Sequence, residues 1–116
     1  MAIYARRHTA ALPGLSEAEV TDLAEIIKIV RMKYDALYNT PMPLMMILRH
    51  PPVKGEHPYC HFHIDLYPIQ RSANKIKYIA GVESGAGTFL NDTVAEEEAE
   101  KLRGLKPDQL TAADRE

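Results

Sequence analysis

The stretch His61-Phe62-His63-Ile64-Asp65-Leu66-Tyr67-Pro68 decides the expected fold of this chain. Apolar and polar residues alternate along it, and alternate residues of an extended strand point to opposite faces of a sheet. The stretch therefore predicts a β-strand with one row of side chains in the core and one row outside. The core row is Cys60, Phe62, Ile64 and Leu66. The outer row is His61, His63, Asp65 and Tyr67.

The outer row is expected to be the functional surface, because four polar side chains in a row are costly to bury without partners. Imidazole and carboxylate groups suit zinc or iron, so one hypothesis is a metal site with help from His50 or His57 in the preceding loop. A second hypothesis is nucleophilic attack by an oriented neutral imidazole. A third is an outer face without a special role, although four of the five histidines gather within fourteen residues.

The sequence ahead of this strand predicts a long helix. Ser16 stands three residues before Glu19, which is the spacing of a capping box. Apolar residues then recur every three or four positions, starting at Val20. We expect a helix over about residues 17–38 that ends at Asn39-Thr40-Pro41.

Two further strands are expected before the histidine-bearing one. The run Pro43-Leu44-Met45-Met46-Ile47-Leu48 is short and apolar and is bounded by proline and His50, which favours a buried strand with methionines as core filler. Ile3-Tyr4 near the N-terminus has the character of the end of a strand whose beginning is absent.

The region after the histidine-bearing strand predicts a connection, a strand and a glycine-rich turn. Residues 68–75 are polar and are interpreted as a connection, and residues 77–83 as a strand. Gly85-Ala86-Gly87 follows, where the backbone has room to approach a phosphate while Lys77 supplies charge, although such glycines are more often a simple turn.

A second capping box predicts a short C-terminal helix. Thr93 stands three residues before Glu96, and the helix is expected to run to about Arg103. We therefore predict an α+β fold, in which an antiparallel sheet is packed by one long helix and this short helix. Residues 1–105 are expected to form one domain, followed by a polar tail over residues 106–116.

Composition limits the class of protein. A chain of 116 residues suffices for one domain, and its net charge of -2 gives no reason to expect a nucleic acid or a membrane surface as partner. No apolar run is long enough to span a membrane. Cys60 is the one cysteine, so an internal disulfide is impossible and a reducing cytoplasm is expected. Since Cys60 falls on the core row, we expect it to be inert.

Several segments together resemble the C-terminal half of galactose-1-phosphate uridylyltransferase, a family of the histidine-triad superfamily. The segments are residues 61–68, Arg71-Ser72, residues 75–92, Arg6-Arg7-His8, Leu15-Ser16 and residues 34–38. The resemblance implies a histidine-triad-like fold whose opening strands are absent. It also implies that the chain is a fragment or that it pairs with a separate N-terminal chain.

The resemblance implies a nucleotidyltransferase that moves a uridylyl group from UDP-glucose to a hexose 1-phosphate. The family's nucleophile lies in a His-Pro-His motif of the N-terminal half, which this chain lacks, so no catalytic residue is expected here. The implied partners are the substrates and the N-terminal half. A homodimer is also expected, because an open sheet edge invites pairing.

The resemblance further implies site residues. A divalent metal, zinc or iron, is implied at His50, His63 and either His61 or Asp65, since two alignments of the strand are possible. The implied substrate-binding residues are Lys77, Tyr78, Val82, Glu83, Gly85 and Gly87. Two alternatives stay open: a stand-alone histidine-triad hydrolase or transferase with His63 as nucleophile, and a non-catalytic metal-binding module.

Overall fold

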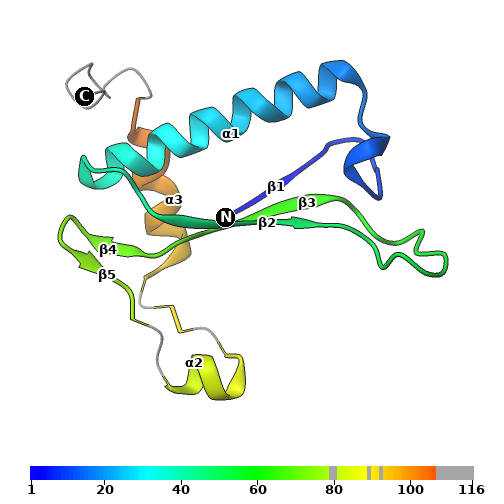
Figure 1. Cartoon of the computed structure of the whole chain (residues 1–116). Helices are drawn as coiled ribbons and strands as arrows, with labels where there is room; N and C mark the ends of the chain where they lie inside the picture. Colours follow the sequence, from blue (N-terminus) through cyan, green and yellow to red (C-terminus); the bar gives the residue numbers. More distant parts are fainter. Residues whose placement is uncertain (79–80, 89, 92, 107–116) are drawn as a thin grey trace. The chain divides into compact units, whose positions relative to one another are not determined.

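The computed structural model describes residues 1–78, 81–88, 90–91 and 93–106 and confirms an α+β fold (Figure 1). The elements are β1 Ala2–Tyr4, the 3-10 turn η1 Leu12–Gly14, α1 Glu17–Tyr38, β2 Leu44–Arg49, β3 His63–Pro68, β4 Gln70–Ser72, β5 Lys75–Ile76, α2 Gly81–Ala86 and α3 Ala95–Gly104. They divide into two compact units. The first holds residues 1–28 and 43–68, and the second holds residues 29–42 and those from 69 onward.

The first unit is built on a three-stranded antiparallel sheet with β3 in the middle. β1 pairs with one edge of β3, so that Tyr4 lies opposite His63. β2 pairs with the other edge, so that Arg49 also lies opposite His63. The strand was predicted to begin at His61 and this is wrong, because the Phe62 amide donates to the Thr9 carbonyl 2.7 Å away and the ladder starts one residue later.

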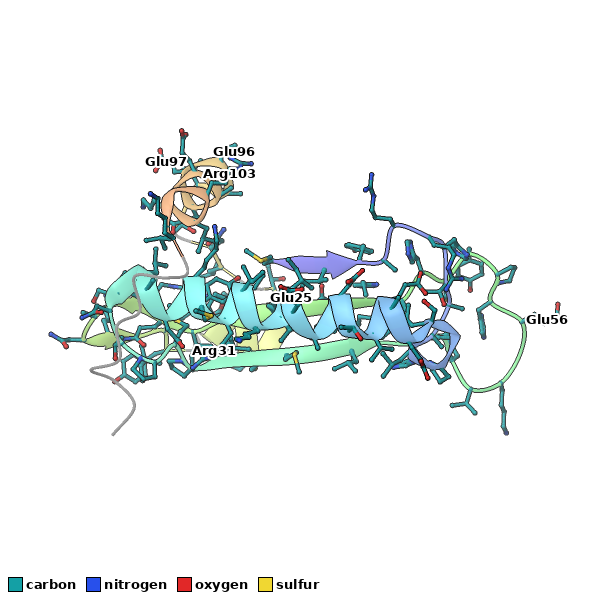
Figure 2. The ribbon with its side chains drawn as sticks, turned by 90° about the horizontal axis from the view of Figure 1, so that it is seen from above. Glu25, Arg31, Glu56, Glu96, Glu97 and Arg103 are labelled. Atoms are coloured by element: carbon teal, nitrogen blue, oxygen red, sulfur yellow. The ribbon has the colours of Figure 1, made fainter. Side chains whose placement is uncertain are left out.

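The predicted alternation of buried and less buried side chains is confirmed from Phe62 to Leu66. Phe62, Ile64 and Leu66 are buried, whereas His63 and Asp65 are half-buried. The first part of α1, residues 17–28, lies across one face of this sheet (Figures 1 and 2). The buried row therefore turns toward the helix, and the polar row occupies the opposite face.

β2 was predicted as a buried strand, and only the strand is confirmed. Its residues Met45, Met46, Ile47 and Leu48 are 37–48% exposed. The reason is its place at the sheet edge, where β3 pairs with one side of it and covers neither face. A short apolar run between prolines predicts extension of the chain, but it does not reveal how many neighbours the strand will have.

The long helix has the predicted bounds and the predicted capping box. Ser16 N donates to Glu19 Oε2 at 2.8 Å, and Glu19 N donates to Ser16 Oγ at 3.3 Å. Arg7 Nε also donates to Glu19 Oε1 at 3.0 Å, and mainly this bond lowers the pKa of Glu19 from 4.5 to about 2. The predicted apolar stripe is only partly covered, since Val20 is 47% exposed.

The second unit begins with the end of α1. Asn39 takes a positive φ of 50°, as the last turn of a helix often requires, and Thr40 N donates to Asp35 O at 3.1 Å. Asp35 Oδ1 then accepts the amide of buried Met42 at 2.7 Å, which turns the chain out of the helix.

Local contacts in the rest of the second unit correct three predictions. Residues 68–75 are not a plain connection, because β4 and β5 form a hairpin there. The strand expected over residues 77–83 is wrong where the structure describes it, since β5 ends at Ile76 and α2 begins at Gly81, and residues 79–80 lie outside the described residues. The second capping box is also wrong: Thr93 Oγ1 donates to Asn91 Oδ1 at 2.9 Å, and Val94, not Thr93, is the N-cap residue of α3.

Helices long and apolar enough to cross a membrane are absent from the part of the chain that the structure describes. Residues 107–116 of the predicted tail lie outside the described residues.

The alternation along the sheet leads to a stability prediction. Ile64 on β3 is 2% exposed, whereas Ile47 on the neighbouring β2 is 37% exposed. We expect Ile64→Ala to lower the free energy of unfolding by about 2–5 kcal/mol and Ile47→Ala by about 1 kcal/mol or less. Urea unfolding measures both, and both variants lose the same side chain from a strand. Equal losses would contradict the burial described.

Candidate functional site

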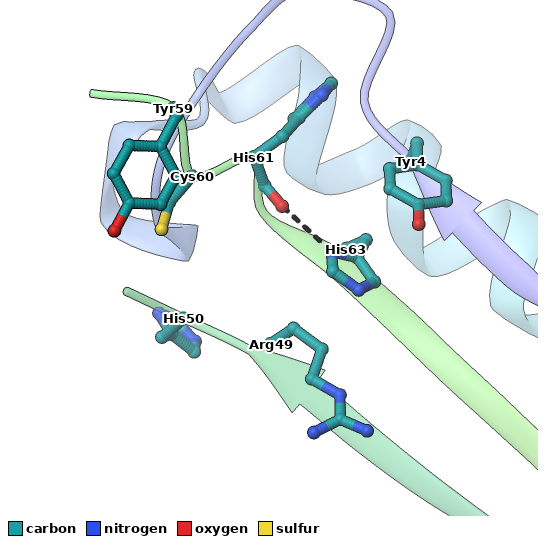
Figure 3. A pocket seen from close by; sticks show the side chains of 7 residues that line it. All are labelled: Tyr4, Arg49, His50, Tyr59, Cys60, His61 and His63. Atoms are coloured by element: carbon teal, nitrogen blue, oxygen red, sulfur yellow. Dashed lines mark hydrogen bonds between the residues drawn. The ribbon is translucent and has the colours of Figure 1, made fainter. Parts of the chain in front are cut away.

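A pocket of about 290 Å³ opens in the first unit on the polar face of the sheet (Figure 3). It is lined by Tyr4, Arg49, His50, Tyr59, Cys60, His61 and His63. Three strands and the loop between β2 and β3 thus contribute to it. Cys60 was predicted to face the core; this is wrong, because it precedes β3 and is half-buried at the pocket wall.

His63 is held in one orientation and one tautomer. Its Nδ1 lies 2.8 Å from the His61 carbonyl, which accepts hydrogen bonds only, so Nδ1 carries the proton. In the neutral form of the ring the lone pair is therefore on Nε2. The Tyr4 ring stacks on it, with the centroids 4.6 Å apart and the planes at 17°. Nε2 is thus suited to bind a metal, accept a hydrogen bond or attack an electrophile.

Asp65 is engaged by its neighbours rather than by His63. Its Oδ2 accepts from Arg49 Nε at 2.9 Å and from the Tyr67 hydroxyl at 3.4 Å, while His63 Nε2 lies 3.9 Å away. The bond from Arg49 is the main reason that the pKa of Asp65 falls below its ordinary value. The carboxylate is therefore ionised and is held against a guanidinium.

His61 does not share the row of His63, because it precedes β3. Its carbonyl, and not its ring, faces His63 (Figure 3). The ring lies 5.7 Å from the Tyr4 ring and 5.1 Å from the His8 ring, measured between centroids. Its Nε2 is sealed from solvent without a hydrogen-bond partner among the described residues. His61 therefore lies ahead of the strand, although it borders the same pocket as His63.

The two loop histidines differ in their surroundings. The His50 ring packs near the Phe62 ring, with centroids 5.1 Å apart, and it lines the pocket. Both nitrogens of His57 are engaged within the loop: Nε2 donates to the Lys54 carbonyl at 2.9 Å, and Nδ1 accepts from the Tyr59 hydroxyl at 3.2 Å. Both ring nitrogens of His57 are therefore occupied by contacts within the loop.

The predicted metal ligands do not make a complete metal site within the described residues. His50, His61 and His63 border one pocket, and imidazoles suit zinc or iron. Nevertheless, no group of three or more histidine, cysteine, aspartate or glutamate side chains there is placed to hold an ion. Asp65 would also have to leave Arg49. Among the described residues the pocket thus offers imidazole donors without a complete set of ligands, and the metal site stays a prediction.

Two predicted substrate-binding residues meet in the second unit. The Lys77 ammonium pairs with Glu83 Oε1 and donates to the Leu90 carbonyl. The Leu90 amide in turn donates to Glu83 Oε1 at 2.9 Å. The Glu83 side chain is 1% exposed and that of Lys77 is 18% exposed. This buried pair joins the segment after β5 to α2.

The other predicted substrate-binding residues surround this pair in sequence and are open to solvent. Tyr78 is 87% and Val82 is 43% exposed. Gly85 and Gly87 are exposed, and a side chain at either position would meet no neighbour among the described residues. Gly87 has a φ of 65°, which other residues rarely adopt, so its need for glycine is conformational.

Sequence reasoning missed Tyr4, Arg49 and Tyr59 as parts of the pocket. Tyr4 and Arg49 reach His63 only through the pairing register of three strands. Alternation within one strand does not contain that information. The available indication was the position of Arg49 at the end of an apolar run, immediately before His50.

The sheet, the covering helix and the histidine on the central strand define an α+β domain with its candidate site on the open face of the sheet. The family described as galactose-1-phosphate uridyl transferase, C-terminal domain, matches residues 1–114. The chain therefore belongs to this family, and the predicted resemblance is confirmed.

Individual relatives agree with this assignment. A galactose-1-phosphate uridylyltransferase of Thermotoga maritima is 37% identical over 103 residues, which are 87% of this chain and 32% of that protein. The protein of the same name from Haemophilus influenzae is 36% identical and covers 86% of this chain and 29% of its own length. A solved structure of a uridylyltransferase mutant superposes with a TM-score of 0.81 at 37% identity, over 88% of this chain and 34% of its own. The chain spans about a third of the length of these relatives.

The contact between Arg49 and Asp65 yields a pH prediction. In Arg49→Met the pKa of Asp65 should rise, because the main cause of its lowering is removed. A lowered carboxyl pKa stabilises the fold above the ordinary pKa and loses that effect as the pH falls. The stability difference between the chain and the variant should therefore be present at neutral pH and vanish in acid.

Carboxyl ¹³C NMR and urea unfolding across the pH range measure the two effects. Lys54→Met is the control, because it removes one positive charge from the loop without touching Asp65. An Asp65 pKa that is the same with and without Arg49 would rule out the contact.

Proposed function

We propose that this chain is the substrate-binding C-terminal part of a UDP-glucose–hexose-1-phosphate uridylyltransferase, with the nucleophilic histidine in an N-terminal half. The observation that carries the proposal is the family match over residues 1–114, together with relatives that bear the name galactose-1-phosphate uridylyltransferase. Those relatives are about three times as long, which leaves room for the rest of the active site. By itself the chain is then inactive.

The Lys77–Glu83 pair supports a role in binding phosphate. An ammonium has three N–H donors, and the bonds to Glu83 and Leu90 use two of them. The buried carboxylate pairs with the ammonium and fixes its position. The third donor is then available to a phosphate oxygen of the substrate, at little cost in side-chain entropy.

The exposed residues beside this pair suit contact with the rest of the substrate. Tyr78 and Val82 present apolar surface next to the lysine in sequence. Gly85 and Gly87 leave their surroundings open, so a ligand has access to the backbone there. We assign these four residues to the walls of the substrate site and Lys77 and Glu83 to its polar contacts.

The edge of the sheet supports the proposed protein partners. β2 carries apolar side chains that are exposed on both faces, and its outer edge is unpaired among the described strands. Such an edge favours addition of a further strand. We assign it to the N-terminal half of the enzyme, and the completed protein to a homodimer in the cytoplasm, where a single cysteine stays reduced.

The proposed metal depends on the same partner. His50 and His63 offer imidazole donors at one pocket, with His61 or Asp65 as the third candidate. Since the described residues do not assemble three donors, we propose that the N-terminal half completes the site for zinc or iron. Bound there, the metal would hold the two halves together.

A chimera tests the transferase. The chain replaces the corresponding C-terminal third of the Thermotoga maritima relative, and the formation of UDP-galactose from UDP-glucose and galactose 1-phosphate is measured. We expect transfer by the chimera. Lys77→Met should lower kcat/KM about 10- to 100-fold, because it removes a charge-assisted bond. Lys75→Met in exposed β5 should leave it unchanged. A folded chimera without transfer, beside an active parent enzyme, would refute the proposal.

Metal analysis of the same chimera tests the metal ligands. After dialysis against zinc or iron, we expect bound metal in the chimera and its loss in His50→Ala and in His63→Ala. His57→Ala should retain the metal, because both of its ring nitrogens are engaged within the loop. Retention of the metal by all three variants would show that the ion is held elsewhere.

A further inference from the structure

Tyr4 is an exposed aromatic residue that contacts two of the pocket histidines. Its ring is stacked on the His63 ring, with the centroids 4.6 Å apart and the planes at 17°. It also meets the His61 ring edge-on, at 5.7 Å between the centroids and 66° between the planes. Because Tyr4 is 55% exposed, its ring contributes little to the core, and its ring contacts lie at the pocket.

The pairing register of the sheet brings Tyr4 to this place. In the antiparallel pairing of β1 with β3, Tyr4 lies opposite His63 and Ile3 lies opposite the buried Ile64. Residues directly opposite each other on antiparallel strands share a face of the sheet and are close enough to touch. Figure 3 shows the Tyr4 ring beside the His63 ring on the neighbouring strand. The core therefore fixes the backbone from which the Tyr4 ring projects.

The orientation of both imidazoles depends on this ring. The hydrogen bond from His63 Nδ1 to the His61 carbonyl holds one atom of the His63 ring, and the face of Tyr4 restricts the tilt of the ring about that bond. The His61 ring lies between the rings of Tyr4 and His8, and its Nε2 has no hydrogen-bond partner among the described residues. Aromatic contacts therefore set the direction of His61.

We propose that Tyr4 is a positioning residue, whose ring holds the imidazoles of His61 and His63 at a fixed angle to each other. Donors that are already oriented lose less freedom when they bind a ligand, so they bind it more tightly. The role needs the aromatic ring and not the hydroxyl group. It rests on the proposed function only for the ligand of the two imidazoles, which is the metal proposed above.

NMR of the chain without metal tests the positioning itself. The chain is treated with EDTA and measured in mildly alkaline buffer, where imidazoles are neutral. Relaxation of the ring carbons reports how far the His61 and His63 rings move, and long-range ¹H–¹⁵N spectra report which nitrogen of His63 carries the proton. In Tyr4→Leu we expect larger motion of both rings and loss of the single Nδ1–H tautomer. Tyr4→Phe should retain the behaviour of the unchanged chain, because it keeps the ring.

Tyr59→Leu is the matched control. Tyr59 also lines the pocket and is 78% exposed, but its ring lies 5.9 Å from the His57 ring, between centroids. This variant should leave the motion of His61 and His63 unchanged. Amide spectra establish that each variant is folded. If Tyr4→Leu does not fold, Tyr4→Ile takes its place, since a β-branched residue suits a strand.

The zinc affinity of the chimera described above measures the consequence for binding. Tyr4→Leu should weaken it about two- to tenfold, which corresponds to the usual strength of an aromatic pair. Tyr4→Phe and Tyr59→Leu should leave it unchanged.

The proposal is overturned if the two imidazoles move no more in Tyr4→Leu than in the unchanged chain, or if Tyr4→Phe or Tyr59→Leu frees them equally. It is also overturned if the chimera binds zinc equally tightly with and without Tyr4→Leu. A chimera that binds no metal in any form contradicts the proposed metal site alone, because the NMR result then decides the role of Tyr4.

Discussion

The pairing of β3 with β1 on one edge and β2 on the other is the constraint from which the candidate site follows. Burial of Ile64 and Leu66 beneath the helix fixes which residues of β3 face outward, because a shift by one residue would exchange the two faces. The same register places Tyr4 and Arg49 opposite His63. The surroundings of the histidine are therefore a result of how the core packs.

Local patterns predicted those features that local interactions determine. The capping box at Ser16 and the bounds of α1 are examples, since the residues that meet there are three apart in sequence. The start of β3 was missed because the amide of Phe62 is taken by Thr9, from a distant part of the chain. The first half of α2 was mistaken for the end of a strand over residues 77–83 and its second half for a glycine-rich turn, because six residues that include two glycines carry no clear period.

The two pairs of oppositely charged side chains differ in how far they are buried. Lys77 and Glu83 neutralise each other in a nearly closed setting, where an unpaired carboxylate would be costly. Arg49 and Asp65 pair at the rim of an open pocket, where water screens them. The sequence predicted Lys77, Glu83 and Asp65 as site residues, which stays a prediction, and the contacts of these side chains became visible only in the folded structure.

The exposed edge strand β2 affects the tendency of the protein to aggregate in the cell. Four apolar residues lie beside backbone groups that no described strand pairs, and such an edge is a template on which strands of other chains can add. Any polypeptide that carries this strand uncovered is prone to aggregate during synthesis and folding. The amount of folded protein that accumulates then depends on how well this edge is shielded, by the N-terminal half proposed above or by chaperones.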